Sequence, residues 1–175
     1  MSSSLHIALL RGVNVGGHRK VPMLALRAVF ESLGLKQVQT YIQSGNAVYA
    51  GQISREPVEA ALEAEFGFAV AVLLRSAAEW ADMTERNPYP LQAAQDGSKV
   101  QLALLDAEPG LEGVAAMMAV QSGADEWVLS GRELFMYTPN GLGRSKLDPQ
   151  RLRVGATTRN WRTVTALSDL LDTSI

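Results

Sequence analysis

Leu5-His6-Ile7-Ala8-Leu9-Leu10 is an almost continuous apolar run that ends at Arg11-Gly12, and it predicts a strand in the middle of a sheet. Pro22 suits the first turn of a helix, and apolar residues then recur at helical spacing until Gly34. The alternating residues that follow predict a β-hairpin, because Gly45-Asn46 supplies two residues that tolerate positive φ. The apolar run is therefore the first strand of a strand, helix and hairpin unit.

The same unit continues with a second helix and a fourth strand. Pro57 opens the predicted helix and Gly67 closes it, and residues 69–74 form another buried strand. With right-handed crossovers, this order predicts an antiparallel ferredoxin-like sheet of strand order 4-1-3-2, with both helices on one face. The first two strands then run the same way, so we expect loop 11–20 and hairpin 43–46 to be neighbours at one edge.

The second half of the chain repeats this pattern less regularly. Ser76 and Glu79 have the spacing of a capping box, which starts a short helix that ends at a proline-rich segment near Asn87-Pro88. A strand at 100–105 and a hairpin at 126–137 follow the same order as in the first half. The intervening helix is expected to turn inward its residues Leu111, Val114, Ala115 and Met118.

The sequence thus predicts the α+β class. A ferredoxin-like βαββαβ N-terminal half is followed by a βαββ-plus-helix half in which no fourth strand is evident. The expected parts are a ferredoxin-like subdomain at 1–75, a helical connector at 76–98, and a second α+β subdomain at 99–175 with a basic C-terminal arm.

Composition excludes several classes of site. The chain has no cysteine and only two histidines, so disulfides and thiolate chemistry are excluded and no metal site is expected. A net charge of −2 makes a general nucleic-acid binder the weaker alternative, because such proteins need a basic surface. The start of the chain has neither a basic nor an apolar targeting segment, and no apolar run reaches membrane-spanning length. We expect a cytoplasmic protein without a membrane partner.

Loop 11–20 is the first candidate site. It reads Arg11-Gly12-Val13-Asn14-Val15-Gly16-Gly17-His18-Arg19-Lys20 and leads from a strand into a helix, where backbone N–H groups and the helix dipole favour anions. Its spacing matches neither the dinucleotide fingerprint nor the Walker loop. A purely structural role, in which the glycines permit a tight turn and the charges are solvated, stays open.

The C-terminal arm is the second candidate. Residues 141–162 carry six basic residues against one acidic residue, in a chain that is negative overall. Such a cluster suits phosphate or carboxylate groups, although it could also neutralise acidic helices of the same fold.

Five segments resemble the bacterial domain-of-unknown-function 1697 family. They are 10–17 (LRGVNVGG), 40–46 (TYIQSGN), Asn87-Pro88, Ser145-Lys146-Leu147 and 157–164 (TTRNWRTV). The resemblance covers almost the whole chain and implies a compact α+β protein built from ferredoxin-like units, but it implies no reaction. The matching positions are Arg11, Asn14, Gly16, Gly17, Ser44, Gly45, Asn46, Lys146, Arg159, Asn160 and Arg162.

These residues except Gly45, together with Lys20, are the predicted ligand-binding residues. The preferred hypothesis is a small phosphorylated or carboxylated ligand, held in a cleft formed by loop 11–20, hairpin 43–46 and arm 141–162. One alternative is an RNA- or DNA-binding protein that uses its sheet face and basic arm; another is a structural or interaction protein without a ligand. The sequence leaves open the cofactor, the oligomeric state and whether any reaction is catalysed.

Overall fold

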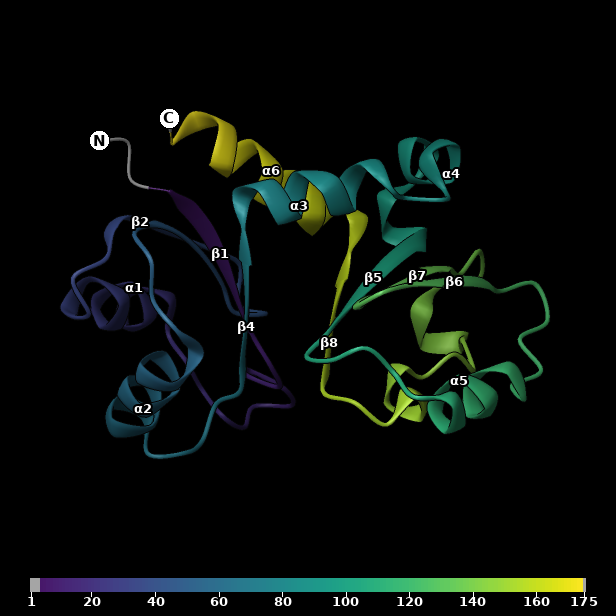
Figure 1. The fold of residues 1–175 in the computed structure, drawn as a ribbon, viewed down its shortest axis with the longest axis horizontal. Coiled ribbons are helices and arrows are strands. Elements are labelled where there is room, and N and C mark those ends of the chain that lie inside the picture. Colours follow the sequence, from purple (N-terminus) through teal and green to yellow (C-terminus); the bar gives the residue numbers. More distant parts are fainter. Residues whose placement is uncertain (1–3, 175) are drawn as a thin grey trace. The chain divides into compact units, whose positions relative to one another are not determined.

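The fold consists of two compact units, each with its own four-stranded antiparallel sheet (Figure 1). It is seen in a computed structural model that describes residues 4–174. The first unit comprises Met1–Asp82 with Leu167–Ile175, and the second comprises Met83–Ala166. Helices and antiparallel sheets together confirm the predicted α+β class.

The first unit has the predicted ferredoxin-like topology. Its elements are β1 (Leu5–Leu10), α1 (Met23–Ser32), β2 (Lys36–Tyr41), β3 (Asn46–Ala50), α2 (Arg55–Phe66) and β4 (Val72–Ser76). The strand order is β2-β3-β1-β4, which is the predicted order counted from the opposite edge. Figure 1 shows α1 and α2 on the same face of this sheet.

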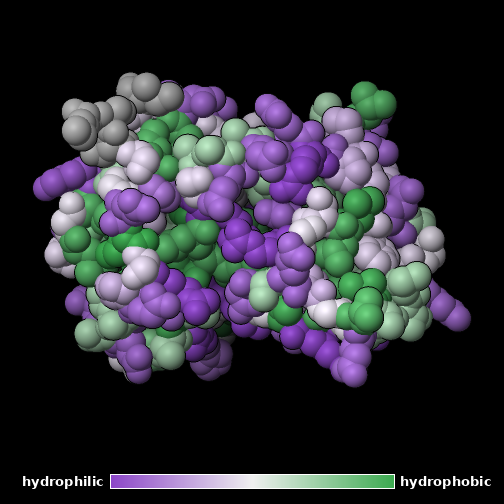
Figure 2. Space-filling view, in the orientation of Figure 1, coloured by the Kyte–Doolittle hydropathy of each residue, from purple (hydrophilic) through white to green (hydrophobic). Residues whose placement is uncertain are grey.

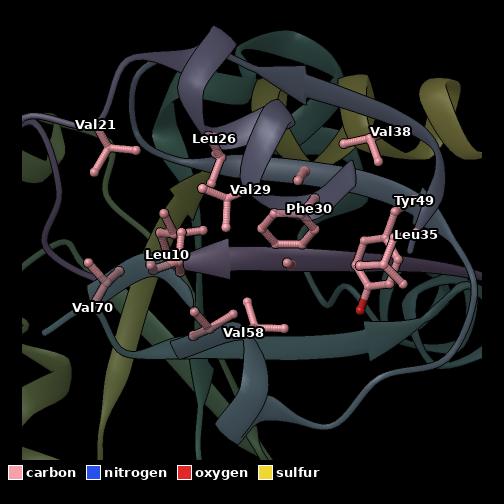
Figure 3. Close-up of a cluster of buried hydrophobic side chains, with 14 of the residues drawn as sticks. Leu10, Val21, Leu26, Val29, Phe30, Leu35, Val38, Tyr49, Val58 and Val70 are labelled. Carbon is pink, nitrogen blue, oxygen red and sulfur yellow. The ribbon is translucent and has the colours of Figure 1, made fainter. Parts of the chain in front are cut away.

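The core of the first unit lies between the sheet and these two helices. Alternate residues of β1 and β3, such as Leu10 and Tyr49, point toward α1 and α2 because side chains in a strand alternate between faces (Figure 3). The Phe30 ring packs tilted against the Tyr49 ring, with centroids 5.4 Å apart. Leu26 of α1 and Val58 of α2 are also fully buried in this cluster.

A further helix, α3 (Ala77–Glu85), begins directly after β4. The predicted capping box is confirmed, since the Glu79 N–H donates to Ser76 Oγ at 3.2 Å and the Ser76 N–H donates to Glu79 Oε2 at 2.8 Å. The Trp80 indole N–H donates to Ser168 Oγ at 3.1 Å, which ties α3 to the C-terminal helix α6 (Trp161–Thr173).

The second unit repeats the strand order of the first. Its further elements are α4 (Pro90–Gln95), η1 (Gly97–Lys99), β5 (Val100–Leu105), α5 (Leu111–Met118), β6 (Glu126–Ser130), β7 (Glu133–Tyr137), η2 (Leu142–Arg144), η3 (Pro149–Leu152) and β8 (Ala156–Asn160). The order β6-β7-β5-β8 corresponds strand by strand to β2-β3-β1-β4. Two short 3₁₀ helices, η2 and η3, connect β7 to β8, the place in the chain order that α2 has between β3 and β4 of the first unit.

The expectation that this half lacks a fourth strand is wrong. Strand β8 pairs antiparallel with β5, and Arg159 lies opposite Leu102. Its sequence, Ala-Thr-Thr-Arg-Asn, has no apolar run because its two buried residues are Thr157 and Arg159. A strand with polar residues on its buried face gives no hydrophobic periodicity to detect.

The predicted inner face of α5 is also wrong. Gly113 and Met117 are its buried residues, whereas Leu111 is 91% exposed and Met118 is 71% exposed. A Cβ atom on Gly113 would overlap the Leu152 backbone of η3, so the helix packs through a glycine. A glycine does not count as an apolar residue in a periodicity analysis. The pattern therefore indicated the face of α5 opposite to the one that carries Gly113.

The surface in view in Figure 2 is mixed, with hydrophobic residues in several separate places among hydrophilic ones. Leu24 of α1 and Leu91 of α4 are among the exposed hydrophobic residues. None of the helices described here is long and apolar enough to cross a membrane.

Candidate functional site

A pocket of about 410 Å³ lies at the N-terminal end of α1. Loop 11–20, the residues that lead into the helix, and hairpin 43–46 all contribute to its lining: Asn14, Gly17, Lys20, Val21, Pro22, Met23 and Gln43. The predicted proximity of the loop and the hairpin is confirmed, because Asn14 Nδ2 donates to the Gln43 carbonyl at 2.7 Å.

Asn14 holds the two sides of this pocket together. Its Nδ2 also donates to the Val21 carbonyl at 3.0 Å, and its Oδ1 accepts from the Val21 N–H at 2.8 Å. Its φ of 54° lies in the left-handed region, which asparagine tolerates better than most residues. The amide group is thus occupied by backbone partners, and Asn14 shapes the site.

Arg19 fixes the far side of the loop. Its Nε donates to the Gly12 carbonyl at 2.8 Å and its Nη2 donates to the Ala69 carbonyl at 2.6 Å. The guanidinium also lies over the Phe68 ring, 4.8 Å from the centroid. Arg19 therefore pins the loop to the connection between α2 and β4.

The hairpin is fixed by a glycine in a crowded position. Gly45 has a φ of 87°, and its carbonyl accepts from the Leu10 N–H at 2.8 Å. A Cβ atom there would lie 2.8 Å from Val13 Cγ2, so both the backbone angle and the space require glycine.

Ser44 and Asn46, two of the predicted ligand-binding residues, take part in the internal structure of this hairpin. Asn46 is fully buried, and its Nδ2 donates to the Tyr41 carbonyl at 2.8 Å and to Ser44 Oγ at 2.9 Å. These bonds satisfy the buried amide and set the hairpin shape. A direct contact of either residue with a ligand stays a prediction.

Ile42 adds backbone strain next to the pocket. Its φ is 43°, which is an outlier for a β-branched residue, and its side chain is 46% exposed. Strain of this kind costs about 1–3 kcal/mol and persists where surrounding structure enforces it, often at functional sites. The neighbouring Gln43 lines the pocket.

The electrostatics of the pocket favour an anion. Lys20 is exposed, and within residues 4–174 no hydrogen bond or ion pair engages its ammonium group. Pro22 is the N-cap residue of helix α1 and provides no side-chain cap, and the first turn of the helix has no acidic residue. The first N–H groups of a helix have no intrahelical acceptors and carry a positive partial charge, so they reinforce the charge of Lys20.

Arg11 lies at the end of β1 and does not line this pocket. Its side chain is half-buried, and its backbone N–H donates to the Ala71 carbonyl at 2.9 Å. Gly16 lies in the exposed part of the loop with a φ of 57°. For both residues a contact with the ligand stays a prediction.

The predicted residues of arm 141–162 belong to the second unit. Lys146 is exposed, whereas Arg159 is only 6% exposed and donates from Nη1 to Thr157 Oγ1 at 2.7 Å and to the Thr158 carbonyl at 3.0 Å. Burial lowers the pKa of Arg159 to about 10. The convergence of the arm with the pocket stays a prediction.

Asn160 and Arg162 are engaged within the second unit. Asn160 Oδ1 accepts from the Thr163 N–H at 3.1 Å, as an N-cap residue of α6 does. Arg162 Nη2 donates to Asp96 Oδ1 at 2.9 Å. Hydrogen bonds from the Ser98 hydroxyl and N–H, together with the charge of Arg162, hold the pKa of Asp96 below its usual value.

Sequence reasoning missed four pocket residues: Val21, Pro22, Met23 and Gln43. Gln43 belongs to the motif segment 40–46, and its place between a strand and a turn is the signal that could have found it. The other three form the apolar part of the pocket and give no chemical signal in the sequence. Among the residues that the structure describes, no group of three or more His, Asp or Glu side chains could hold a metal ion.

A family described as protein of unknown function (DUF1697) has a model that matches residues 4–135. The chain belongs to the DUF1697 family. No curated protein matches this DUF1697 chain. The family match confirms the resemblance for the motif segments that lie within residues 4–135 and, like them, brings no reaction.

Among solved structures, the DUF1697 chain is similar to the conserved bacterial protein SP0830 from Streptococcus pneumoniae. The identity is 22% and the TM-score is 0.74, with 97% of this chain and 99% of that chain covered. An unknown protein from Galdieria sulphuraria is 11% identical, with a TM-score of 0.26 and coverage of 99% and 92%. The first likeness supports the fold alone, and the second supports no conclusion.

Proposed function

We propose that this DUF1697 protein binds a small anionic ligand, with a phosphate or carboxylate group, in the pocket at the start of α1. The observation that carries the proposal is the position of Lys20 beside an uncapped helix N-terminus in a cavity of about 410 Å³. Both groups attract the same charge, and none of the described residues that line the cavity is acidic.

The remaining lining suggests where the parts of the ligand lie. Gly17 lets backbone approach an anion without a Cβ in the way, and glycine adopts its φ of 77° readily. Gln43 offers a side-chain amide, while Val21, Pro22 and Met23 provide an apolar wall for the uncharged part of the ligand. The proposal concerns binding and names no reaction.

The central strands do not favour the nucleic-acid alternative. Domains of this topology that bind RNA stack bases on exposed aromatic residues of the sheet. Tyr49, the aromatic residue of β3, is fully buried here, and its ring packs against Phe30. A role as a structural protein without a ligand remains the other alternative, and the experiment below separates it from the proposal.

Thermal-shift measurements with inorganic phosphate, sugar phosphates, nucleotides and small carboxylates test the proposal. A ligand that binds only the folded state raises the melting temperature. We expect at least one anion to do so, and we expect Lys20→Ala to weaken its binding roughly tenfold because a charge-assisted contact is lost. If arm 141–162 contributes to the site, Lys146→Ala should weaken anion binding as well.

Lys36→Ala is the matched control, since Lys36 is an exposed lysine of the same unit that does not line the pocket. This variant should bind the anion like the wild type. Equal binding by the Lys20 and Lys36 variants, or no stabilisation by any anion, would refute the proposal.

A further inference from the structure

A second pocket, of about 480 Å³, lies within the second unit. Its lining comes from the end of α3, from α4 and from the first turns of α6: Thr84, Glu85, Asn87, Pro90, Ala93, Ala94, Trp161 and Thr165. Two motif segments of the sequence, Asn87-Pro88 and 157–164, thus reach one pocket that the anion site does not use.

Four of the eight lining residues, Pro90, Ala93, Ala94 and Trp161, form an aromatic and apolar part of the pocket wall, and the other four are polar or charged. Trp161 is half-buried and packs tilted against Phe135, with ring centroids 6.4 Å apart. Asn160 caps α6, which fixes Trp161 as the first residue of the helix. Pro90, Ala93 and Ala94 add small apolar surfaces from α4, which a hydrocarbon stem can contact.

Among the lining residues within 4–174, Glu85 is the one that carries a charge. In the part of the chain covered by the structure, its carboxylate has no ion-pair or hydrogen-bond partner. Arg86, which follows Glu85, and Arg162, which follows Trp161, are engaged elsewhere. Arg86 lies 3.4 Å from Glu133 and donates to Ser130 Oγ at 2.7 Å, and Arg162 donates to Asp96 at 2.9 Å.

We propose that this pocket is a second ligand site that takes an organic cation, namely an ammonium or guanidinium group on an apolar stem. A carboxylate and an indole ring that line one pocket are a combination that attracts such groups, through charge and through the electron-rich face of the ring. The cation is carried either by a free small amine or by a lysine or arginine side chain of a partner protein.

NMR spectroscopy of the tryptophan indole N–H groups tests this site directly. The cross-peak of Trp161 is assigned from its absence in Trp161→Phe, and the full chain is titrated with butylguanidinium. We expect a saturable shift of this cross-peak, with no comparable shift for butylurea, which has a similar shape and no charge. Glu85→Gln should weaken binding about fivefold, the upper range for an exposed ion pair.

Glu65→Gln is the matched control, because Glu65 is an exposed glutamate of α2 outside the pocket, and its affinity should equal that of the wild type. Ala94→Leu should abolish binding by filling the pocket. Tighter binding of N-acetyl-argininamide than of butylguanidinium would indicate a protein partner, and the reverse order a free amine. No saturable shift, an equal response to butylurea, or an unchanged affinity of Glu85→Gln would overturn the proposal.

Discussion

The hydroxyl group of Tyr49 is an unusual feature at the scale of single residues. It is buried in the core of the first unit, and no atom within residues 4–174 forms a hydrogen bond with it. Burial raises the pKa of Tyr49 to about 12. An unsatisfied buried hydroxyl costs free energy that a plain phenyl ring would not.

Tyr49→Phe should therefore raise the free energy of unfolding, by about 1 kcal/mol. Urea denaturation of both proteins measures the difference, and Tyr41→Phe, at a half-buried position of β2, serves as the comparison. A clear loss of stability in Tyr49→Phe would mean that the hydroxyl is satisfied, for example by an internal water molecule.

Asp96 gives a second prediction at this scale. Its folded-state pKa is below the ordinary 3.8, mainly because of the Ser98 hydroxyl and then the Ser98 N–H, with Arg162 contributing less. A carboxyl with a lowered folded-state pKa stabilises the fold above its unfolded-state pKa, and this stability is lost as pH falls through the folded-state pKa. The contribution is therefore present at neutral pH and disappears below about pH 4.

NMR titration of the side-chain carboxyl should show that Ser98→Ala raises the pKa of Asp96 more than Arg162→Gln does. The reverse ranking would show that the charge of Arg162, and not the hydrogen bonds, governs this carboxyl.

Individual residues of the candidate site were predictable to different degrees. Gly17 and Lys20 follow from the chemistry of a glycine-rich loop before a helix, and both line the pocket. Asn14 was a candidate because it matches the family motif, yet its amide is bound to backbone, a role that no sequence spacing reveals. The sequence did not predict the burial of Arg159 either, since an arginine in a basic segment usually indicates a solvated surface.

At the scale of elements, the contact between α5 and η3 depends on a glycine, which has no side chain. Gly113 lies inside a helix, where alanine would ordinarily be about 1 kcal/mol more favourable. A Cβ atom would nevertheless overlap the Leu152 backbone, which cannot move aside as a flexible side chain can.

Gly113→Ala should consequently destabilise the second unit, by about 1–3 kcal/mol, in spite of the better helix propensity. Gly143→Ala is the control, since a Cβ on Gly143 would meet no atom within 4 Å. Thermal unfolding compares the two variants, and a melting temperature of Gly113→Ala at or above that of the wild type would contradict this account.

The elements that were predicted correctly carry strong local signals. Strand β1 is an apolar run, α1 starts at a proline, and the turn of the β2–β3 hairpin contains Gly45. Strand β8 and the inner face of α5 were missed because their burial is decided by partners distant in sequence, a β5 ladder and the η3 backbone. Tertiary contacts there override the local pattern.

At the scale of the whole molecule, the chain contains one strand order twice, and the first unit is completed by the end of the chain. Residues 167–175 group with the first unit, where Gln39 Nε2 of β2 donates to Ser174 Oγ at 3.0 Å. Leu167 is fully buried. The sequence could not predict this, because periodicity shows that α6 has an apolar stripe and not which sheet the stripe meets.

Leu167→Ala should lower the free energy of unfolding by about 2–5 kcal/mol, the usual cost of a cavity at a buried leucine. Hydrogen exchange should show protection lost in β2 and β3 more than in β6 and β7. Asp169→Ala, at an exposed position of the same helix, is the control. Equal loss in the two sheets would contradict the assignment of this segment to the first unit.

The bonds that Asn14 makes to Gln43 and Val21 have a kinetic consequence. Because these hydrogen bonds already join the loop and the hairpin, the pocket need not close around the anion when the anion binds. Association should then be a single step whose rate constant rises linearly with anion concentration, without a saturating phase, and falls with ionic strength as expected for attraction to Lys20. In Asn14→Ala, stopped-flow traces should acquire a slow phase, because ordering of the loop then becomes a step of anion binding.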